Sequence, residues 1–190
     1  LLAEGTKRVS EKLGQGSERF AMHVKGLELA AYDCRATKIT GLAFCTANRG
    51  GDHITGYIQG PTFMDIPLLV VEESVIEDAR VENPAEAKIV KDLEDALSVF
   101  DAVGVCKFMG MALMAEDITP IIAGATGWDF DVADFRKAGE RIYNLARLFN
   151  IREGCTRADD TLPKRLTEEP LPDGPAKGLV VDLEPLLDAY

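Results

Sequence analysis

Histidine, tryptophan and cysteine are scarce in this sequence of 190 residues, with two, one and four copies. No two cysteines have the short spacing of a zinc or redox motif. Four cysteines are also too few for a disulfide-dense scaffold. The sequence contains no catalytic triad, P-loop or dinucleotide fingerprint. The enzyme classes that these motifs define are therefore not indicated.

Positive charge is in deficit as well, with 21 Lys and Arg against 32 Asp and Glu, a net charge of −11. Proteins that bind nucleic acid carry a basic surface, so we expect neither nucleic acid nor an anionic membrane as a partner. The longest apolar run, residues 66–71, is far too short to span a bilayer. No signal peptide is evident, so we expect a cytoplasmic protein with reduced cysteines.

Hydrophobic residues make up 46% of the chain and charged residues 28%, which is typical of a globular protein with a real core. The chain begins at Leu1 rather than Met and stops at Tyr190 within an apolar-periodic stretch. We therefore expect residues 1–190 to form a single helical region that is a fragment of a longer chain.

Helical periodicity dominates the sequence. The clearest helix follows Asn83, an N-cap residue succeeded by Pro84 and, at the capping-box position, Glu86. We expect this helix to run to about Phe100. Its apolar face consists of Val90, Leu93, Leu97 and Phe100.

A second strong helix is predicted from Asp131 to a stop at Gly154. Its apolar stripe, which we expect to face the core, consists of Val132, Phe135, Ile142, Leu145 and Phe149.

The weaker patterns complete the prediction of an all-α, irregular multi-helix domain. Strand patterns are short, no hairpin signature is present, and a proline-rich surface connection covers residues 161–177. The weaker helices are predicted at 5–13, 39–48, 74–80, 119–125 and 183–189, and the strands at 20–24 and 179–181.

Residues 47–53 form the first candidate site. Gly50 and Gly51 permit unusual dihedrals or a close approach to a ligand, and they place Asp52 and His53 on a loop. The simpler interpretation is a glycine C-cap followed by a surface histidine.

Residues 101–106 form the second candidate site, at the end of the predicted helix. Asp101 can accept hydrogen bonds from a polar ligand, Gly104 allows approach to the main chain, and Cys106 can bind a soft metal as thiolate. The alternative is a helix terminus with a buried, inert cysteine. A third cluster, residues 152–165, is dense in both charge signs, and its default interpretation is a solvated loop with surface ion pairs.

In their order along the chain, these clusters resemble the C-terminal part of the tungsten-containing aldehyde ferredoxin oxidoreductase family. Residues 16–28 are similar to the segment leading into the family's Tyr-Asp-Pro-Arg motif, which reads Tyr32-Asp33-Cys34-Arg35 here. Residues 49–53 follow, and residues 101–106 resemble the family's Asp-x-x-Gly-Leu-Cys pterin motif. Residues 152–165 resemble its Arg-Glu-Gly…Arg…Asp-Asp…Leu-Pro…Arg signature.

Two positions depart from the family pattern. Cys34 stands where the family has proline, so this turn is less rigid, and Val105 conservatively replaces leucine.

The resemblance implies an enzyme of anaerobes that oxidises aldehydes to carboxylic acids and passes electrons singly to ferredoxin. Its cofactors would be tungstopterin, a tungsten-bispyranopterin, and a [4Fe–4S] cluster. Cys106 would be the fourth cluster ligand. Asp101 would accept hydrogen bonds from pterin N–H groups, and Gly104 and Val105 would offer main-chain contacts. His53 would lie near tungsten and assist proton transfer.

The family's β-rich domain and its three clustered cysteines have no counterpart in these 190 residues. We therefore expect the fragment alone to be inactive, and its partners to be the remaining domains of the same polypeptide, ferredoxin and an aldehyde. The choice of aldehyde, tungsten versus molybdenum, and a homo-oligomer stay open. The alternative from another class is a non-catalytic helical domain that binds a partner protein.

Overall fold

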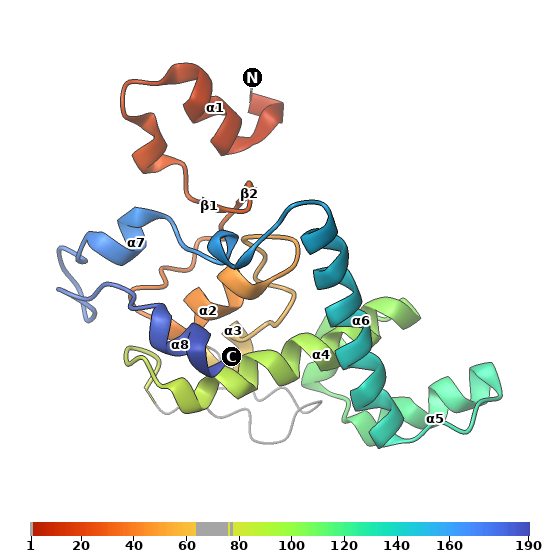
Figure 1. The fold of residues 1–190 in the computed structure, drawn as a ribbon. Coiled ribbons are helices and arrows are strands. Elements are labelled where there is room, and N and C mark those ends of the chain that lie inside the picture. Colours follow the sequence, from red (N-terminus) through yellow and green to blue (C-terminus); the bar gives the residue numbers. More distant parts are fainter. Residues whose placement is uncertain (1, 64–75, 77) are drawn as a thin grey trace.

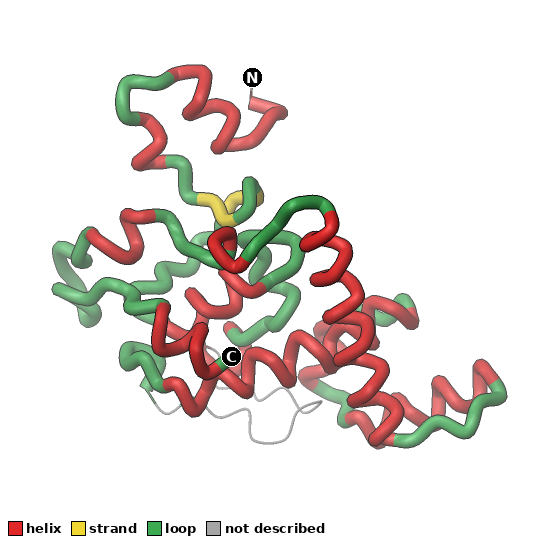
Figure 2. The backbone as a smooth tube through the Cα atoms, viewed as in Figure 1, coloured by secondary structure: helices red, strands yellow, loops and turns green. Residues whose placement is uncertain are grey.

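The computed structural model describes residues 2–63, 76 and 78–190, and it confirms the all-α prediction (Figures 1 and 2). Short 3-10 turns lie at Leu2–Glu4, Ser17–Phe20, Pro84–Glu86, Lys107–Met111 and Arg157–Asp159. The strands are β1 (His23–Val24) and β2 (Leu27–Glu28). The helices are α1 (Gly5–Leu13), α2 (Lys38–Thr46), α3 (Gln59–Phe63), α4 (Ala87–Val103), α5 (Ala115–Thr126), α6 (Val132–Arg152), α7 (Lys164–Glu168) and α8 (Glu184–Ala189).

Helix α4 crosses the body of the molecule and carries much of the core (Figure 1). The Asn83 side chain accepts a hydrogen bond from the Ala85 N–H at 3.1 Å, as expected of an N-cap residue. A 3-10 turn then precedes the α-helix, which extends three residues beyond the expected end at Phe100. The predicted apolar face is confirmed, because Val90, Leu93, Leu97 and Phe100 are all fully buried.

Helix α6 packs against α4 in its first half. Asp131 and Asp134 form a reciprocal capping box at its start. The Phe135 ring lies edge-on to Phe100, with ring centroids 6.4 Å apart. Gly139 allows the close approach of the two helices, because a Cβ there would lie 2.3 Å from the main-chain oxygen of Asp95.

The expected burial of the second half of α6 is wrong. Leu145 is 69% exposed and Phe149 is 54% exposed. The second half of α6 meets the body through polar side chains instead: Arg147 donates to Asp160 at 2.8 Å, and Asn150 donates to the main-chain oxygen of Asn48 at 2.7 Å. Its large apolar side chains therefore stay exposed among the described residues.

Helix α2 is buried along its whole length. Its residues are apolar on nearly all sides, as expected for a helix surrounded by other elements. The ammonium group of Lys38 is compensated by the Glu82 carboxylate at 2.7 Å and by the main-chain oxygen of Val180. This helix therefore fixes the position of the loop that follows it.

A short hairpin forms at residues 23–28, although this segment carries no Asn-Gly or Asp-Gly hairpin signature. β1 and β2 pair as an antiparallel hairpin, and its turn residues Lys25 and Gly26 have φ values of +50° and +88°. A non-glycine residue rarely adopts a positive φ. Hydrogen bonds of the Lys25 ammonium group offset this unfavourable backbone conformation: it donates to the main-chain oxygens of Cys45 and Ala47 at 2.6 and 3.0 Å.

The other weak predictions have mixed outcomes. Helices are confirmed near 5–13, 39–48, 119–125 and 183–189. The strand expected at 20–24 is reduced to β1, and the one expected at 179–181 does not form. The connection at 161–177 contains helix α7. Of the expected helix at 74–80, residues 74, 75 and 77 lie outside the described residues, as does the apolar run 66–71, and Arg80 lies in a turn. Among the described residues, no helix is long and apolar enough to cross a membrane.

Candidate functional site

The loop after α2 is held by the carboxylate of Asp52. Its Oδ1 accepts the Ile54 N–H at 3.0 Å, and its Oδ2 accepts the Thr55 hydroxyl at 2.6 Å. Arg49 lies 3.3 Å from the same Oδ2. Burial raises the pKa of this carboxyl, but the hydrogen bonds and nearby positive charges outweigh burial and leave the pKa below its ordinary value. Asp52 therefore fixes the loop as an ionised group.

The two glycines of this loop serve packing against the hairpin. A Cβ on Gly50 would lie 2.4 Å from the main-chain oxygen of Val24, and one on Gly51 would lie 2.7 Å from that of Leu27. Gly51 also donates its N–H to the Val24 oxygen at 3.2 Å. The C-cap interpretation is wrong, because α2 ends at Thr46, before either glycine. The close approach that needs glycine is to the hairpin backbone.

His53 lies half-buried on this loop, directly after Asp52. Its ring is tilted against the ring of Tyr32, with centroids 5.7 Å apart. The hydrogen bonds from Ile54 and Thr55 to Asp52 hold the part of the loop that directly follows His53. The imidazole is thus carried by a fixed loop and keeps partial access to solvent.

The second predicted site lies where α4 ends. Gly104 has a φ of +75°. Its N–H donates to the main-chain oxygen of Asp101, and the Val105 N–H donates to the main-chain oxygen of Phe100 at 2.9 Å. This is the hydrogen-bonding pattern of a left-handed glycine helix terminus. A Cβ on Gly104 would meet nothing, so the main chain here is open to a ligand. Val105 packs against the core, and Asp101 has a side chain that is 60% exposed.

Cys106 differs from the other thiols. Cys34 and Cys45 are fully buried, and burial raises the pKa of each thiol far above its ordinary value. Cys155 is half-buried, whereas Cys106 is exposed at the surface. The alternative of a buried, inert cysteine at this helix terminus is therefore wrong.

The donor set tests whether Cys106 suits a metal cluster. In the part of the chain that the structure describes, no three His, Cys, Asp or Glu side chains lie together as a metal site. A lone accessible thiol can supply one ligand to a metal group whose other ligands come from elsewhere. The residues present thus fit the role of a single contributed thiolate.

Lys107 connects the two predicted sites, and the sequence analysis did not identify it as a site residue. Its Nζ lies 2.8 Å from Asp101 Oδ2 and 3.5 Å from the main-chain oxygen of Ile54. The ring of Phe108 contacts the ring of Tyr57, with centroids 5.0 Å apart. The His53 loop and the 101–106 segment therefore form one surface. The residue after Cys106 was a visible charge in the motif, but only the fold shows what it contacts.

The charged cluster at 152–165 contains a buried ion-pair group instead of surface pairs alone. Asp160 Oδ1 lies 2.8 Å from both Arg147 and Lys25, and its second oxygen also accepts a hydrogen bond from Arg147. Asp160 and Lys25 are almost wholly buried. The default interpretation as a solvated loop holds for Arg152, which is exposed, but is wrong for Asp160.

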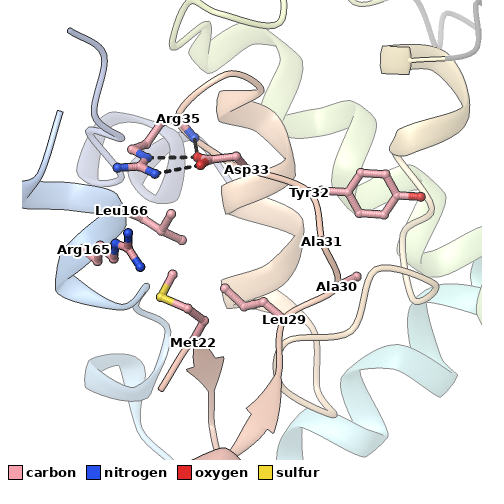
Figure 3. Close-up of a pocket in the computed structure, with 9 residues that line it drawn as sticks. All are labelled: Met22, Leu29, Ala30, Ala31, Tyr32, Asp33, Arg35, Arg165 and Leu166. Carbon is pink, nitrogen blue, oxygen red and sulfur yellow. Dashed lines mark hydrogen bonds and ion pairs between the residues drawn. The ribbon is translucent and has the colours of Figure 1, made fainter. Parts of the chain in front are cut away.

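Tyr32, Asp33 and Arg35 of the Tyr32-Asp33-Cys34-Arg35 segment line a cavity of about 390 Å³ between the hairpin and α7 (Figure 3). Arg35 is buried, forms an ion pair with Asp33 at 2.7 Å and donates to the main-chain oxygen of Glu169. In Figure 3 the Tyr32 side chain points away from this ion pair. The segment thus joins α7 through Arg35 and reaches His53 through Tyr32.

Comparison with known proteins finds matches over the whole chain. A family model described as aldehyde ferredoxin oxidoreductase, domains 2 and 3, matches residues 1–190. The tungsten-containing aldehyde ferredoxin oxidoreductases of Thermococcus kodakarensis and Pyrococcus furiosus are each 40% identical over the whole chain, and that of Pyrococcus horikoshii is 42% identical. The chain spans 30% of the length of each of these relatives.

A more distant relative carries a different name. The aliphatic sulfonate oxidoreductase, WOR-like subunit, of Pyrococcus furiosus is 28% identical over 94% of the chain. The match of the family model over every residue decides the question: the chain belongs to the aldehyde ferredoxin oxidoreductase family.

Proposed function

We propose that this chain is part of a cytoplasmic oxidoreductase that oxidises aldehydes to carboxylic acids and passes the electrons to ferredoxin. One observation carries the proposal: Lys107 links the segment that carries the exposed thiol of Cys106 and the exposed carboxylate of Asp101 to the loop that holds His53. Relatives that are about 40% identical are named as tungsten-containing enzymes of this kind. A tungsten-bispyranopterin centre would supply two-electron oxidation, and a [4Fe–4S] cluster would supply single-electron exit.

Cys106 would hold the cluster from this side. Thiolates are the usual ligands of iron–sulfur clusters. The thiol of Cys106 is exposed at the N-cap of the Lys107–Met111 turn, so it is available to a group bound outside the described residues. The other three ligands would come from the remaining domains of the same polypeptide.

Asp101 would bind the N–H edge of a pterin. A carboxylate accepts charge-assisted hydrogen bonds, each worth about 1.5–3 kcal/mol. Gly104 leaves the adjoining main chain uncovered, because no atom lies within 4 Å of the position that a Cβ would take. Gly104 and Val105 would therefore add main-chain contacts beside the carboxylate.

His53 would accept a proton during the oxidation. Conversion of an aldehyde and water to an acid releases two protons with the two electrons, so a base near the substrate is useful. Imidazole is the side chain that enzymes use most often as a general base. The hydrogen bonds of Asp52 and the ring of Tyr32 would keep the imidazole in place.

A non-catalytic domain that binds a partner protein is the second candidate. Its support is an apolar cavity of about 520 Å³ between α4, α5 and α6, beside which Ile121 and Trp128 are exposed. The same surface also suits a region that packs against the rest of a longer polypeptide. The apolar surface alone does not favour this candidate. The enzyme is favoured because the segment with Asp101 and Cys106 is linked through Lys107 to the loop that carries His53.

The test uses the full polypeptide that contains this chain, purified without oxygen. We expect tungsten, iron and sulfide in the wild type. Cys106→Ser should lose the reduced-cluster EPR signal, and the control Cys155→Ser should keep it. His53→Asn should keep tungsten and iron but lose about 10²–10⁴-fold in turnover per tungsten. A wild-type protein without metal would favour the partner-binding domain.

A further inference from the structure

We propose that Lys107 is a positioning residue whose ammonium group orients the Asp101 carboxylate and ties the end of α4 to the loop that carries His53. The inference rests on the proposed function, because it concerns Asp101 as a cofactor contact and His53 as a proton acceptor. It adds a residue that neither the sequence motif nor the comparisons assign a role.

The position of the ammonium group is specific. Lys107 is 9% exposed, whereas the side chain of its partner Asp101 is 60% exposed. Lysine is rarely buried without a partner, because removing an ammonium group from water is costly. Here the Nζ lies 2.8 Å from Asp101 Oδ2. The buried cation therefore reaches outward to an exposed carboxylate.

This contact holds the Asp101 carboxylate through Oδ2, which lies 2.8 Å from the ammonium group. A carboxylate held through one oxygen cannot rotate freely about its last bond, so the direction of Oδ1 is defined. An acceptor with a defined direction binds a donor group at a smaller entropic cost than a mobile one.

The second half of the link is the His53 loop. The Lys107 Nζ lies 3.5 Å from the main-chain oxygen of Ile54, the residue after His53. The same loop carries the Asp52 carboxylate, whose negative charge interacts electrostatically with the Lys107 ammonium group. One ammonium group thus lies between Asp101 on α4 and both the carbonyl and the carboxylate of the loop.

The neighbouring residue strengthens the same junction. Phe108 places its ring against that of Tyr57, and Tyr57 is buried with a φ of +41°. That backbone conformation is unfavourable for a residue with a side chain, so the surrounding contacts must hold it. Lys107 and Phe108 together hold both ends of the segment from Ile54 to Tyr57.

The experiment compares Lys107→Met, Lys107→Arg and a matched control in the full polypeptide, purified without oxygen. Lys107→Met keeps most of the apolar stem and removes the charge. Lys88→Met is the control, since Lys88 is an exposed lysine of α4 paired with Asp92 on the same helix. The readouts are amide hydrogen exchange of residues 53–57, tungsten per polypeptide, and turnover per tungsten.

We expect Lys107→Met to speed exchange in residues 53–57 by about tenfold or more and to lower tungsten content several-fold. Lys107→Arg should restore tungsten content to within about twofold of wild type, because it keeps the cation. Lys88→Met should match wild type in all three readouts. A merely structural role would lower thermal stability without this rescue and without a change in tungsten per folded protein.

Wild-type exchange and tungsten content in Lys107→Met would overturn the inference and leave the proposed function intact. A wild-type polypeptide that holds no tungsten would instead overturn the proposed function. If Lys107→Met does not fold, Asp101→Asn replaces it, because this variant removes the charge that the ammonium group holds. Faster exchange in residues 53–57 of Asp101→Asn would support the link, and unchanged exchange would refute it.

Discussion

Helices α4 and α6 pack against each other, yet they use their apolar residues differently. α4 fully buries Val90, Leu93, Leu97 and Phe100. α6 buries Phe135, Gly139 and Tyr143 but exposes large apolar side chains in its second half. Both helices have a periodic sequence pattern, so periodicity indicates an apolar stripe without showing which part of it the described chain covers. The exposed residues of α6 are Leu145, Leu148, Phe149 and Ile151.

Replacement of a phenylalanine in each half of α6 should give the largest difference. Phe135→Ala removes a fully buried ring that packs on Phe100, and we expect a loss of about 3–5 kcal/mol in the free energy of unfolding. Phe149→Ala should cost less than about 1 kcal/mol, because that ring is half-exposed and contacts Arg152. Urea denaturation followed by circular dichroism measures both. Equal losses would show that the second half of α6 is buried in solution.

The crossing of the two helices is tested at Gly139. Gly139→Ala places a Cβ against the Asp95 main chain, which cannot yield as a side chain can, so we expect a loss of about 3 kcal/mol. Gly124→Ala in α5 is the matched control, because a Cβ there meets nothing. It should stabilise the protein by about 0.5–1 kcal/mol, since alanine is the better helix former. A neutral Gly139→Ala would mean that the helices can separate at little cost.

A third prediction concerns Glu94, a fully buried acid of α4 that accepts hydrogen bonds from Thr46 and Tyr190. Burial raises the pKa of this carboxyl to about 7 from an ordinary 4.5, against the effect of these hydrogen bonds. As pH rises above 4.5, the unfolded chain releases the proton while the folded chain retains it. The stability contributed by the neutral group is therefore present below pH 4.5 and is lost as pH rises through 7.

Glu94→Gln removes this titration. The stability of wild type relative to the variant should fall by about 2–3 kcal/mol between pH 5 and pH 8. Other groups titrate alike in both proteins and cancel in the difference. Urea denaturation at four pH values measures it, and parallel curves for the two proteins would contradict a raised pKa at Glu94.

The elements that the sequence predicted well are those with local causes. Asn83 and Asp131 cap their helices through hydrogen bonds to residues two or three positions away, so the starts of α4 and α6 are visible in the sequence. The helix end at Gly104 is equally local. The placement of Asp101 and Gly104 at the end of α4 therefore followed from the sequence, whereas the exposure of Cys106 did not.

The features that the sequence missed depend on distant contacts. Lys25 adopts a positive φ in the hairpin turn because its ammonium group binds the end of α2 and Asp160. Gly50 is required by a hairpin that the sequence did not predict. Lys107 meets Ile54 across 53 residues of sequence. The sequence shows the charge of a side chain and so the kind of group it can bind, but only the tertiary fold determines which group it contacts.

The smallest predicted effect compares the two helix caps. Asn83→Ala and Asp131→Ala each remove a side-chain acceptor of a main-chain N–H at a helix start, and each should cost about 1 kcal/mol. Asp131 also places a negative charge at the positive end of the α6 dipole, which contributes about 0.3–1 kcal/mol at low ionic strength. The cost of Asp131→Ala should therefore shrink when salt is raised to about 0.5 M, because salt screens this interaction. The cost of Asn83→Ala should stay the same, since a neutral amide has no such contribution. Urea denaturation at low and high salt separates the two, and an equal salt response would show that the caps act only through their hydrogen bonds.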